Sequence, residues 1–301
     1  MHVHVVISTA TSAPLKPKLI IVNAAYVRDG DRRDISSTSD EQPAEARAIV
    51  NGYYLQYSKS PNRTVRDASF AMNGHKFTGP ALESTMMFEG ALEGWLADPE
   101  PNSDVLRHSA AADARVLDPL ESVDGAQCVV LTGSSKYGST TFWCDPKLRY
   151  LARKIVIAKS EHDLIGKARV GDLRLRAPGA GLMAPSRITF TADSIKFETV
   201  GAVTLPMSCH VAERYDFPGG IWYAREATIT REDVDLHPDL SKPGLLVPDL
   251  PDGTRLSNQE NLQIPYEWRA GKPVPLVNQS AVQQMDATAA AARAARNGIG
   301  R

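Results

Sequence analysis

The sequence predicts an α+β fold that is mostly β, in which an antiparallel sheet wraps around one helix. Many strands with a single strongly amphipathic helix among them are typical of antiparallel sheets, whereas parallel sheets alternate strands with helices. The stretch 124–158 reads as three consecutive strands, and apolar residues occupy both alternating positions of these strands. A strand that is apolar on both sides is covered on both sides, so we expect another layer over this segment.

The N-terminal part predicts strands joined by turns. Residues 2–8 and 18–22 are rich in β-branched residues, and residues 31–34 form a charged strand that we expect to be exposed. The strongest hairpin signal in the chain is the stretch 47–57, which contains Asn-Gly at its centre. Asn-Gly suits a type I′ turn, because both central residues of that turn take positive φ.

Residues 80–97 follow a helical period. One apolar stripe recurs at i, i+3, i+4, i+7 and i+8: Phe88, Ala91, Leu92, Trp95 and Leu96. Met86 and Met87 widen this stripe, and the prolines that follow residue 97 end the helix. We therefore expect a helix over 80–97 to cover the strands that come next.

Three strands follow this helix and form the centre of the predicted sheet. They cover residues 126–132, 139–144 and 150–158. The Gly- and Ser-rich run 133–138 has the composition of a turn, so the first two strands should pair antiparallel. We expect Phe142 or Trp143 to pack against the helix over 80–97.

A second sheet-like section begins near residue 186. Apolar residues alternate with polar ones there, which predicts one buried and one solvated face. The alternating apolar positions are Ile188, Phe190, Ala192, Val203, Leu205, Met207, Cys209 and Val211. Short strands are predicted at 263–268 and 274–277.

The domain prediction is one half-barrel-like, β-rich domain over residues 1–275, with a sub-boundary near 160–186. Residues 276–301 form an Ala-rich tail. The stretch 281–296 could be helical but lacks a strong apolar stripe, so we expect a frayed tail.

Composition excludes several classes of protein. The formal net charge is −1, from 34 Lys and Arg against 35 Asp and Glu, so no basic stripe is available for nucleic acid. No apolar run reaches about 18 residues, so no transmembrane span is predicted. The first residues lack a basic region and a long apolar core, so no signal peptide is visible. The protein is then cytosolic, or this chain begins after a leader.

No catalytic motif emerges from the sequence, and we predict a protein that is not an enzyme and needs no cofactor or metal. Cys209-His210 resembles a thiol–base pair, but adjacent residues of a strand point to opposite faces. His2 and His4 share one face of a strand and could form half of a metal site, yet the spacing places no third ligand. Three cysteines do not make a disulfide framework, although a cross-strand bridge between Cys128 and Cys144 is one alternative to two small buried apolar residues.

Turn and strand signatures in two parts of the chain carry a resemblance to a known fold group. The first part reads Asp124-Gly125-x-x-Cys128-Val129-Val130-Leu131, then Thr141-x-Trp143-x-Asp145-Pro146, then Tyr150-Leu151-x-Arg153. The second reads Leu250-Pro251-Asp252-Gly253-Thr254, then Ile264-x-Tyr266-x-Trp268-x-x-Gly271-Lys272. Over residues 20–275 this pattern resembles the LolA/LolB-like and RseB-like lipoprotein carriers of bacterial envelopes, especially the long outer-membrane lipoprotein-sorting type.

The resemblance implies a curved antiparallel half-barrel whose concave side is closed by helices, with an apolar cavity between them. It also implies a periplasmic or cell-envelope location, with the cytoplasm as the alternative because no signal peptide is visible. The residues expected to line the cavity are Met86, Met87, Phe88, Leu92, Trp95 and Trp143. Methionine suits such a lining because its flexible thioether adapts to varied chains.

Three functions are compatible with this reading. The first is non-enzymatic binding, chaperoning or transport of an acyl chain, a lipidated protein or an apolar peptide in the half-barrel. The second is an RseB-like sensor, in which the strands beyond residue 186 contact an envelope protein partner and no lipid is transferred. The third, ranked last, is a β-rich hydrolase whose catalytic groups are distant in the sequence.

Overall fold

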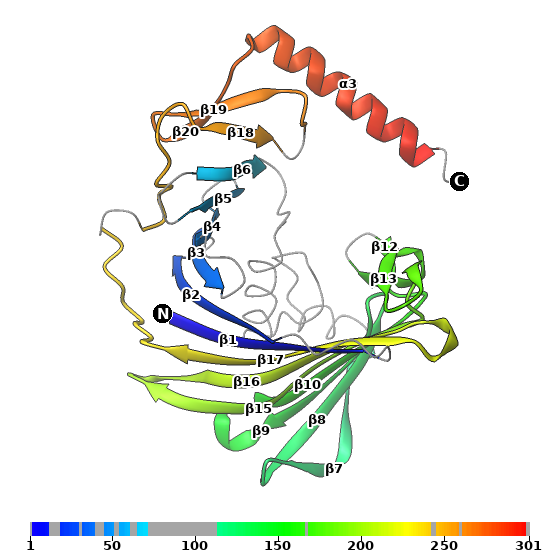
Figure 1. Ribbon diagram of the computed structural model, residues 1–301. Helices are drawn as coiled ribbons and strands as arrows, with labels where there is room; N and C mark the ends of the chain where they lie inside the picture. Colours follow the sequence, from blue (N-terminus) through cyan, green and yellow to red (C-terminus); the bar gives the residue numbers. More distant parts are fainter. Residues whose placement is uncertain are drawn as a thin grey trace. The chain divides into compact units, whose positions relative to one another are not determined.

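The computed structural model describes residues 2–11, 19–29, 32–39, 45–50, 54–60, 65–71, 113–165, 168–241, 245–258 and 261–298. They are mostly strand, with one α-helix among them (Figure 1). The chain divides into two compact units: unit 1 holds residues 1–23 and 83–236, and unit 2 holds residues 24–82 and 237–301. Each unit combines segments that are distant in the sequence. The predicted limits of one domain over 1–275 and a tail over 276–301 stay predictions.

Unit 1 contains a curved antiparallel sheet with the strand order β1-β17-β16-β15-β10-β9-β8-β7 (Figure 1). The strands are β1 (His2–Thr11), β7 (Arg115–Val123), β8 (Ala126–Ser135), β9 (Gly138–Asp145), β10 (Leu151–Ser160), β15 (Arg187–Val200), β16 (Val203–Asp216) and β17 (Trp222–Glu232). Two short hairpins accompany it: β11 (Leu164–Ile165) with β12 (Ala168–Arg169), and β13 (Leu175–Ala177) with β14 (Gly181–Met183). Within the described residues, the strand order does not close on itself. The predicted fold class, α+β and mostly β with a curved, open antiparallel sheet, is confirmed.

The three predicted central strands are present, and their antiparallel pairing is confirmed in β8, β9 and β10. Ser135 pairs with Gly138, so only Lys136 and Tyr137 form the turn between β8 and β9. The run 133–138, predicted as a turn, is therefore mostly strand. Small residues are found in both turns and strands, and here the pairing with β9 makes them part of the strand.

Buried side chains lie on both faces of this central hairpin. Val130 pairs with Trp143 and Leu131 pairs with Phe142, so Val130 and Phe142 point to opposite faces. Val130 is 1% exposed and Phe142 is 2% exposed. The predicted cover on both faces is thus confirmed at these two positions. The helix predicted over 80–97 lies outside the described residues.

A buried carboxylate fixes the end of β9. Asp145 caps the 3₁₀ helix η1 (Pro146–Leu148) by accepting a hydrogen bond from the backbone N–H of Lys147 at 2.8 Å. Its other oxygen accepts from Arg153 Nε at 2.7 Å, at a β-bulge in β10. Burial alone would raise the pKa of Asp145, but the hydrogen bonds from Arg153 and Lys147 outweigh it and hold the pKa below its usual value.

Asp145→Asn is expected to lower the free energy of unfolding by about 2 kcal/mol at pH 7, because hydrogen bonds to a charged group are lost. The lowered pKa means that this stabilisation is fully present above the unfolded-state pKa of about 4 and is lost as the pH falls through the folded-state value. Urea unfolding of both proteins between pH 3 and pH 7 measures the difference. A difference that stays constant down to pH 3 would contradict the assigned charge state.

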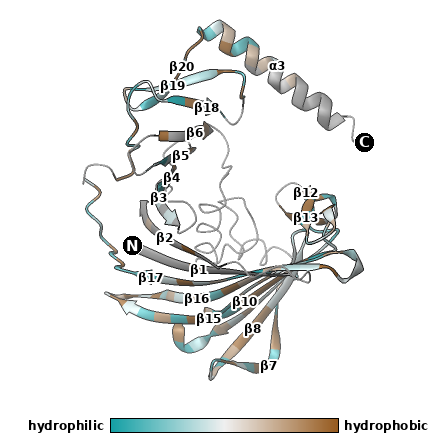
Figure 2. Ribbon diagram, in the orientation of Figure 1, coloured by the Kyte–Doolittle hydropathy of each residue, from teal (hydrophilic) through white to brown (hydrophobic). Residues whose placement is uncertain are grey.

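The long hairpin of β15 and β16 bears out the alternation predicted beyond residue 186. Apolar and polar residues alternate along both strands (Figure 2). Ile188, Phe190 and Ala192 are buried, and so are Cys209 and Val211. The outer end differs from the prediction, because Val203 is exposed and the strands there project beyond the pairing with β10.

Unit 2 contains strands in the order β20-β19-β18-β6-β5-β4-β3. They are β3 (Arg32–Ser39), β4 (Glu45–Val50), β5 (Tyr54–Lys59), β6 (Val65–Ala71), β18 (Arg255–Asn258), β19 (Pro265–Arg269) and β20 (Lys272–Pro275). The predicted hairpin over 47–57 is confirmed, with Val50 paired to Tyr54. β18 pairs in parallel with β6, which joins the C-terminal strands to the N-terminal ones. β2 (Leu19–Asp29) begins in unit 1 and ends in unit 2.

A compact core holds the strands of unit 2 together. Its buried members are Leu55, Tyr57, Ala68, Phe70, Leu250, Leu256 and Trp268. Tyr266 packs its ring edge against Phe70 with centroids 4.7 Å apart. Trp268 is among the largest fully buried side chains, which accounts for the aromatic signature of this segment.

The Ala-rich end of the chain is helical, in α3 (Gln279–Gly298) (Figure 1). Alanine has the highest helix propensity, so the segment forms a helix without a strong apolar stripe. Among the described residues, no helix combines the length and the apolar character needed to cross a membrane.

Candidate ligand-binding face

One face of the unit 1 sheet is a continuous buried apolar surface, called the apolar face below. Its residues come from β10, β15, β16 and β17, and each is at most 4% exposed: Ile155, Ile157, Ile188, Phe190, Ala192, Cys209, Val211, Ala227 and Ile229. One row runs straight across four strands, because Ile155 pairs with Ala192, Ala192 with Val211 and Val211 with Ala227. The period-2 alternation of the sequence is what brings these residues to one side.

The opposite face of the same strands is polar and partly exposed. His210 Nδ1 lies 3.1 Å from a carboxylate oxygen of Asp193, and Glu226 and Thr228 are exposed. The sheet therefore separates an apolar side from a solvated one, as expected for antiparallel strands.

A buried ion pair stands in the apolar register of β16 and β17, beside Phe190 of β15. Arg225 donates to Glu213 Oε2 from Nη2 at 2.8 Å and from Nε at 3.2 Å, and Glu213 is only 1% exposed. Burial raises the pKa of Glu213, although the charge of Arg225 opposes that shift. Burial alone would lower the pKa of Arg225, but the charge and hydrogen bond of Glu213, together with the nearby Tyr215 and Tyr223, outweigh it and raise the pKa.

Two tyrosines lie beside this pair. Tyr215 pairs with Tyr223 across β16 and β17, with ring centroids 6.1 Å apart. Burial raises the pKa of both phenols and Glu213 adds to this shift, although the charge of Arg225 opposes it. Both phenols therefore stay neutral at physiological pH.

Arg231 lies toward the opposite end of the apolar face. It continues the row of Ala227 and Ile229 along β17, since every second residue of a strand points to the same side. Arg231 is 8% exposed, and among the described residues neither its Nε nor its Nη2 has a hydrogen-bond partner. Along β17, Ala227 and Ile229 thus lie between Arg225, which is paired with Glu213, and Arg231, whose Nε and Nη2 atoms have no partner among the described residues.

The thiols are unsuited to catalysis. Cys128, Cys144 and Cys209 are free, so the bridge considered between Cys128 and Cys144 is absent. Cys144 pairs with Val129 across β8 and β9, so the two side chains share a face. Cys128 precedes Val129 on β8 and therefore points to the opposite face. Burial raises the pKa of Cys209 to about 12, which keeps it a thiol.

The residue pair Cys209-His210 is split between the two faces, as predicted. Cys209 belongs to the apolar face, whereas His210 is half-buried on the polar face beside Asp193. Within the part of the chain that the structure describes, no group of three His, Cys, Asp or Glu residues is arranged to hold a metal ion. His2 and His4 both belong to β1, and their side chains lie outside the described part.

The ligand-lining residues predicted from the sequence are mostly beyond what the structure describes. Met86, Met87, Phe88, Leu92 and Trp95 lie in the stretch 72–112, outside the described residues. Trp143 is half-buried on the face opposite to Phe142. Its indole Nε1 donates to Glu121 Oε2 at 2.7 Å, and Lys154 Nζ lies 4.9 Å from its ring centroid. The role of these six residues as a ligand lining stays a prediction.

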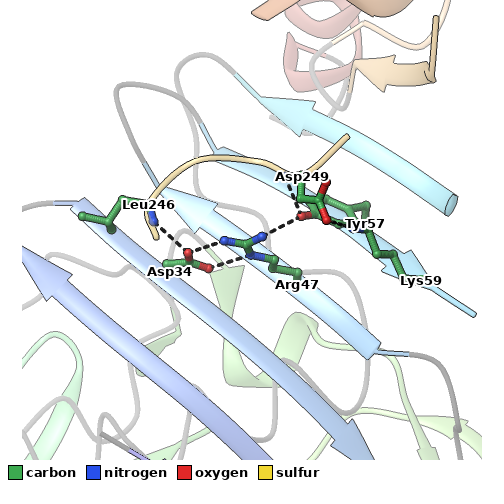
Figure 3. A network of polar contacts seen from close by, with 6 residues as sticks. All are labelled: Asp34, Arg47, Tyr57, Lys59, Leu246 and Asp249. Atoms are coloured by element: carbon green, nitrogen blue, oxygen red, sulfur yellow. Dashed lines mark hydrogen bonds and ion pairs between the residues drawn. The ribbon is translucent and has the colours of Figure 1, made fainter. Parts of the chain in front are cut away.

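A separate polar network organises unit 2 (Figure 3). Asp34 of β3 accepts hydrogen bonds from Arg47 Nε at 2.9 Å and Nη2 at 2.5 Å, and from the backbone N–H of Leu246 at 2.9 Å. Arg47 also donates to the hydroxyl of Tyr57 at 3.2 Å, and that oxygen accepts from the backbone N–H of Asp249 at 3.2 Å. The network therefore ties the segment 245–250 to β3, β4 and β5.

The charged side chains of Asp34 and Arg47 in this network are largely buried and paired with each other, as expected for a structural role. Asp34 is 5% exposed, so the prediction of an exposed charged strand over 31–34 is wrong at this residue. The sequence pattern did not show that Arg47, across the sheet, would neutralise it. Burial alone would lower the pKa of Arg47, but its interactions with Asp34 and Tyr57 together outweigh burial and raise the pKa. Burial raises the pKa of Tyr57.

The chain is similar, at low identity, to several solved structures. A DUF1329 family protein from Desulfovibrio piger is 12% identical with a TM-score of 0.39, over 81% of this chain and 90% of that one. A candidate outer membrane lipoprotein-sorting domain from Vibrio parahaemolyticus is 10% identical with a TM-score of 0.35, over 81% and 91%. A chain of the Pseudomonas aeruginosa MucA/MucB complex is 11% identical with a TM-score of 0.23, over 77% and 94%.

A lipoprotein-sorting domain, the type of protein that the sequence resembles, is thus among the structures similar to this chain. No protein-family model matches the chain, and no curated protein matches it at a significant level. With TM-scores below 0.5, the similar structures assign neither a ligand nor a partner to this chain.

Sequence reasoning did not single out Glu213, Arg225 or Arg231. One signal was available, because each of the three stands at a position whose alternating neighbours are apolar: Val211 beside Glu213, Ala227 beside Arg225, and Ile229 beside Arg231. A charged residue that is buried in the apolar register of a strand is paired, bound to a ligand or solvated.

Proposed function

We propose that this chain is a non-enzymatic binding protein that holds an acyl chain, a lipidated protein or an apolar peptide on the apolar face of unit 1. The observation that carries the proposal is the unbroken row of buried apolar side chains across four strands, from Ile155 to Ala227, together with the arginines that precede and follow the apolar residues of β17. Apolar sites with a few placed polar groups are the usual form of small-molecule sites. The role follows the lipoprotein-sorting type that the sequence resembles, in the cell envelope.

The chemistry of the apolar face suits binding and not reaction. Its side chains are aliphatic or aromatic apart from Cys209, whose pKa of about 12 keeps it protonated. Acid–base catalysis needs groups that titrate near neutral pH, and nucleophilic catalysis needs an activated nucleophile. We therefore propose no reaction for this face.

Ala227→Leu tests the proposal with a matched control. Ala227 is buried at the centre of the apolar face, so the added bulk should occupy ligand space and weaken a fluorescent fatty acid about tenfold, which corresponds to about 1.4 kcal/mol. Ala224→Leu makes the same change on the same strand but on the opposite face, and it should leave the dissociation constant within about twofold.

Fluorescence titration gives the two constants, and circular dichroism reports whether both variants are folded. Equal weakening by the two variants would speak against the apolar face as the site. A folded wild-type protein that binds no acyl probe would defeat lipid binding altogether. The alternative would then lead, namely an RseB-like sensor in which the strands beyond residue 186 contact an envelope protein.

A further inference from the structure

Arg231 is a buried arginine whose charge no described residue neutralises. It is 8% exposed, and its Nε and Nη2 atoms have no hydrogen-bond partner among the residues described. It lies in the penultimate position of β17, and Ile229 and Ala227 precede it on the same face. Arginine remains protonated in proteins, so this guanidinium cannot shed its charge to relieve its burial.

The contrast with Arg225 on the same strand and face is informative. Arg225 is satisfied by two hydrogen bonds to Glu213. A buried charge without a partner is strongly unfavourable, and buried charges in folded proteins are paired, bound to a ligand or solvated. The two arginines are six residues apart, so the apolar stretch between them measures about 20 Å along the strand. One cation is used within the protein, and the other is available to an anion.

We propose that the apolar face accepts an amphiphile with an anionic head group, and that Arg231 binds this head while the chain lies over Ile229 and Ala227. The head is a carboxylate or a phosphate monoester, because the planar guanidinium fork forms two parallel hydrogen bonds with either. This inference rests on the proposed function and narrows it from any apolar chain to chains that carry a negative charge at one end. It makes Arg231 the specificity-determining residue of the site.

The test compares three probes that share one chain: oleate, oleyl phosphate and the neutral oleyl alcohol. Each displaces a fluorescent acyl reporter from the full-length protein. Hydrogen bonds to a charged group are stronger than those to a neutral one, so the wild type should bind oleate or oleyl phosphate at least about tenfold more tightly than the alcohol. The comparison of oleate with oleyl phosphate identifies which anion the site prefers.

Arg231→Met keeps an unbranched stem that ends near the position of Nε, and it removes the charge. It should abolish the preference for the anionic probes while the alcohol binds as in the wild type. The ligand-free variant should melt at the same or a higher temperature, because a buried unpaired charge has been removed. Arg214→Met is the matched control, since Arg214 lies on the polar face of β16 and forms a half-exposed ion pair with Asp216. This control should retain the full preference.

The outcomes separate the two proposals. A wild type that binds all three probes equally, or an Arg231→Met variant that keeps the preference for anions, overturns the role of Arg231 and leaves acyl binding intact. A wild type that binds none of the probes defeats the proposed function and this inference together. If Arg231→Met does not fold, Arg231→Gln removes the charge with a polar side chain, and its loss or retention of the anion preference decides the question.

Discussion

Asp34→Ala is expected to lower the free energy of unfolding by about 3–5 kcal/mol, because it leaves the guanidinium of Arg47 buried without its counter-charge. Asp34 accepts three hydrogen bonds, two from Arg47 and one from the backbone N–H of Leu246. The substitution removes all three hydrogen bonds at once. Urea unfolding monitored by tryptophan fluorescence measures the loss, since Trp268 lies in the core of the same unit.

The effect should also be local to the segment 245–250. The amide of Leu246 donates to Asp34, so its hydrogen exchange should accelerate more than that of Trp268, whose amide donates to Thr254 O at 2.8 Å. Asp249→Ala is the control: Asp249 forms an ion pair with Lys59, but its side chain is 74% exposed, so the change should cost at most about 1 kcal/mol. Equal losses from the two substitutions would mean that the Asp34 network does not hold this segment.

The sequence predicted those elements whose structure is determined by residues close to one another along the chain. Asn51-Gly52 predicted the hairpin of β4 and β5, and alternating apolar residues predicted the buried side of β15 and β16. Apolar residues of both parities predicted cover on both faces, which Val130 and Phe142 bear out. In each case, side-chain periodicity and turn chemistry act over a few residues, and a single sequence contains that information.

Features set by distant residues were not predictable in the same way. Asp34 appeared to belong to an exposed strand, and its burial depends on Arg47 and on a segment more than 200 residues later. Glu213 and Arg225 meet through the register of β16 against β17, which their separation in the sequence does not specify. The parallel pairing of β6 with β18 is equally non-local. A charged residue at a position whose alternating neighbours are apolar is the sign of such a pairing in the sequence.

Glu213→Ala is expected to destabilise the protein by about 3–5 kcal/mol, because it leaves Arg225 on the apolar face without its counter-charge. Replacing both residues tests whether the charges themselves matter. The double substitution Glu213→Leu with Arg225→Met fills similar volume with apolar atoms, and buried ion pairs replaced in this way often give neutral or more stable proteins. We expect the double variant to unfold within about 1 kcal/mol of the wild type, or above it. A double variant as unstable as Glu213→Ala would assign the loss to packing and not to the unpaired charge.

The pH dependence of Glu213→Gln distinguishes these causes further. Burial raises the pKa of Glu213 above its unfolded value despite the opposing charge of Arg225. The folded state therefore holds this proton more tightly, and the corresponding stabilisation is fully present below the unfolded-state pKa of about 4.3 and is lost as the pH rises through the folded-state value. Glutamine mimics the protonated acid at every pH, so the stability of the wild type relative to Glu213→Gln should fall between pH 4 and pH 7. Urea unfolding at both values measures the change. A relative stability that rises over this range would show that Arg225 outweighs burial at Glu213, and the ion pair would then be a source of stability at neutral pH.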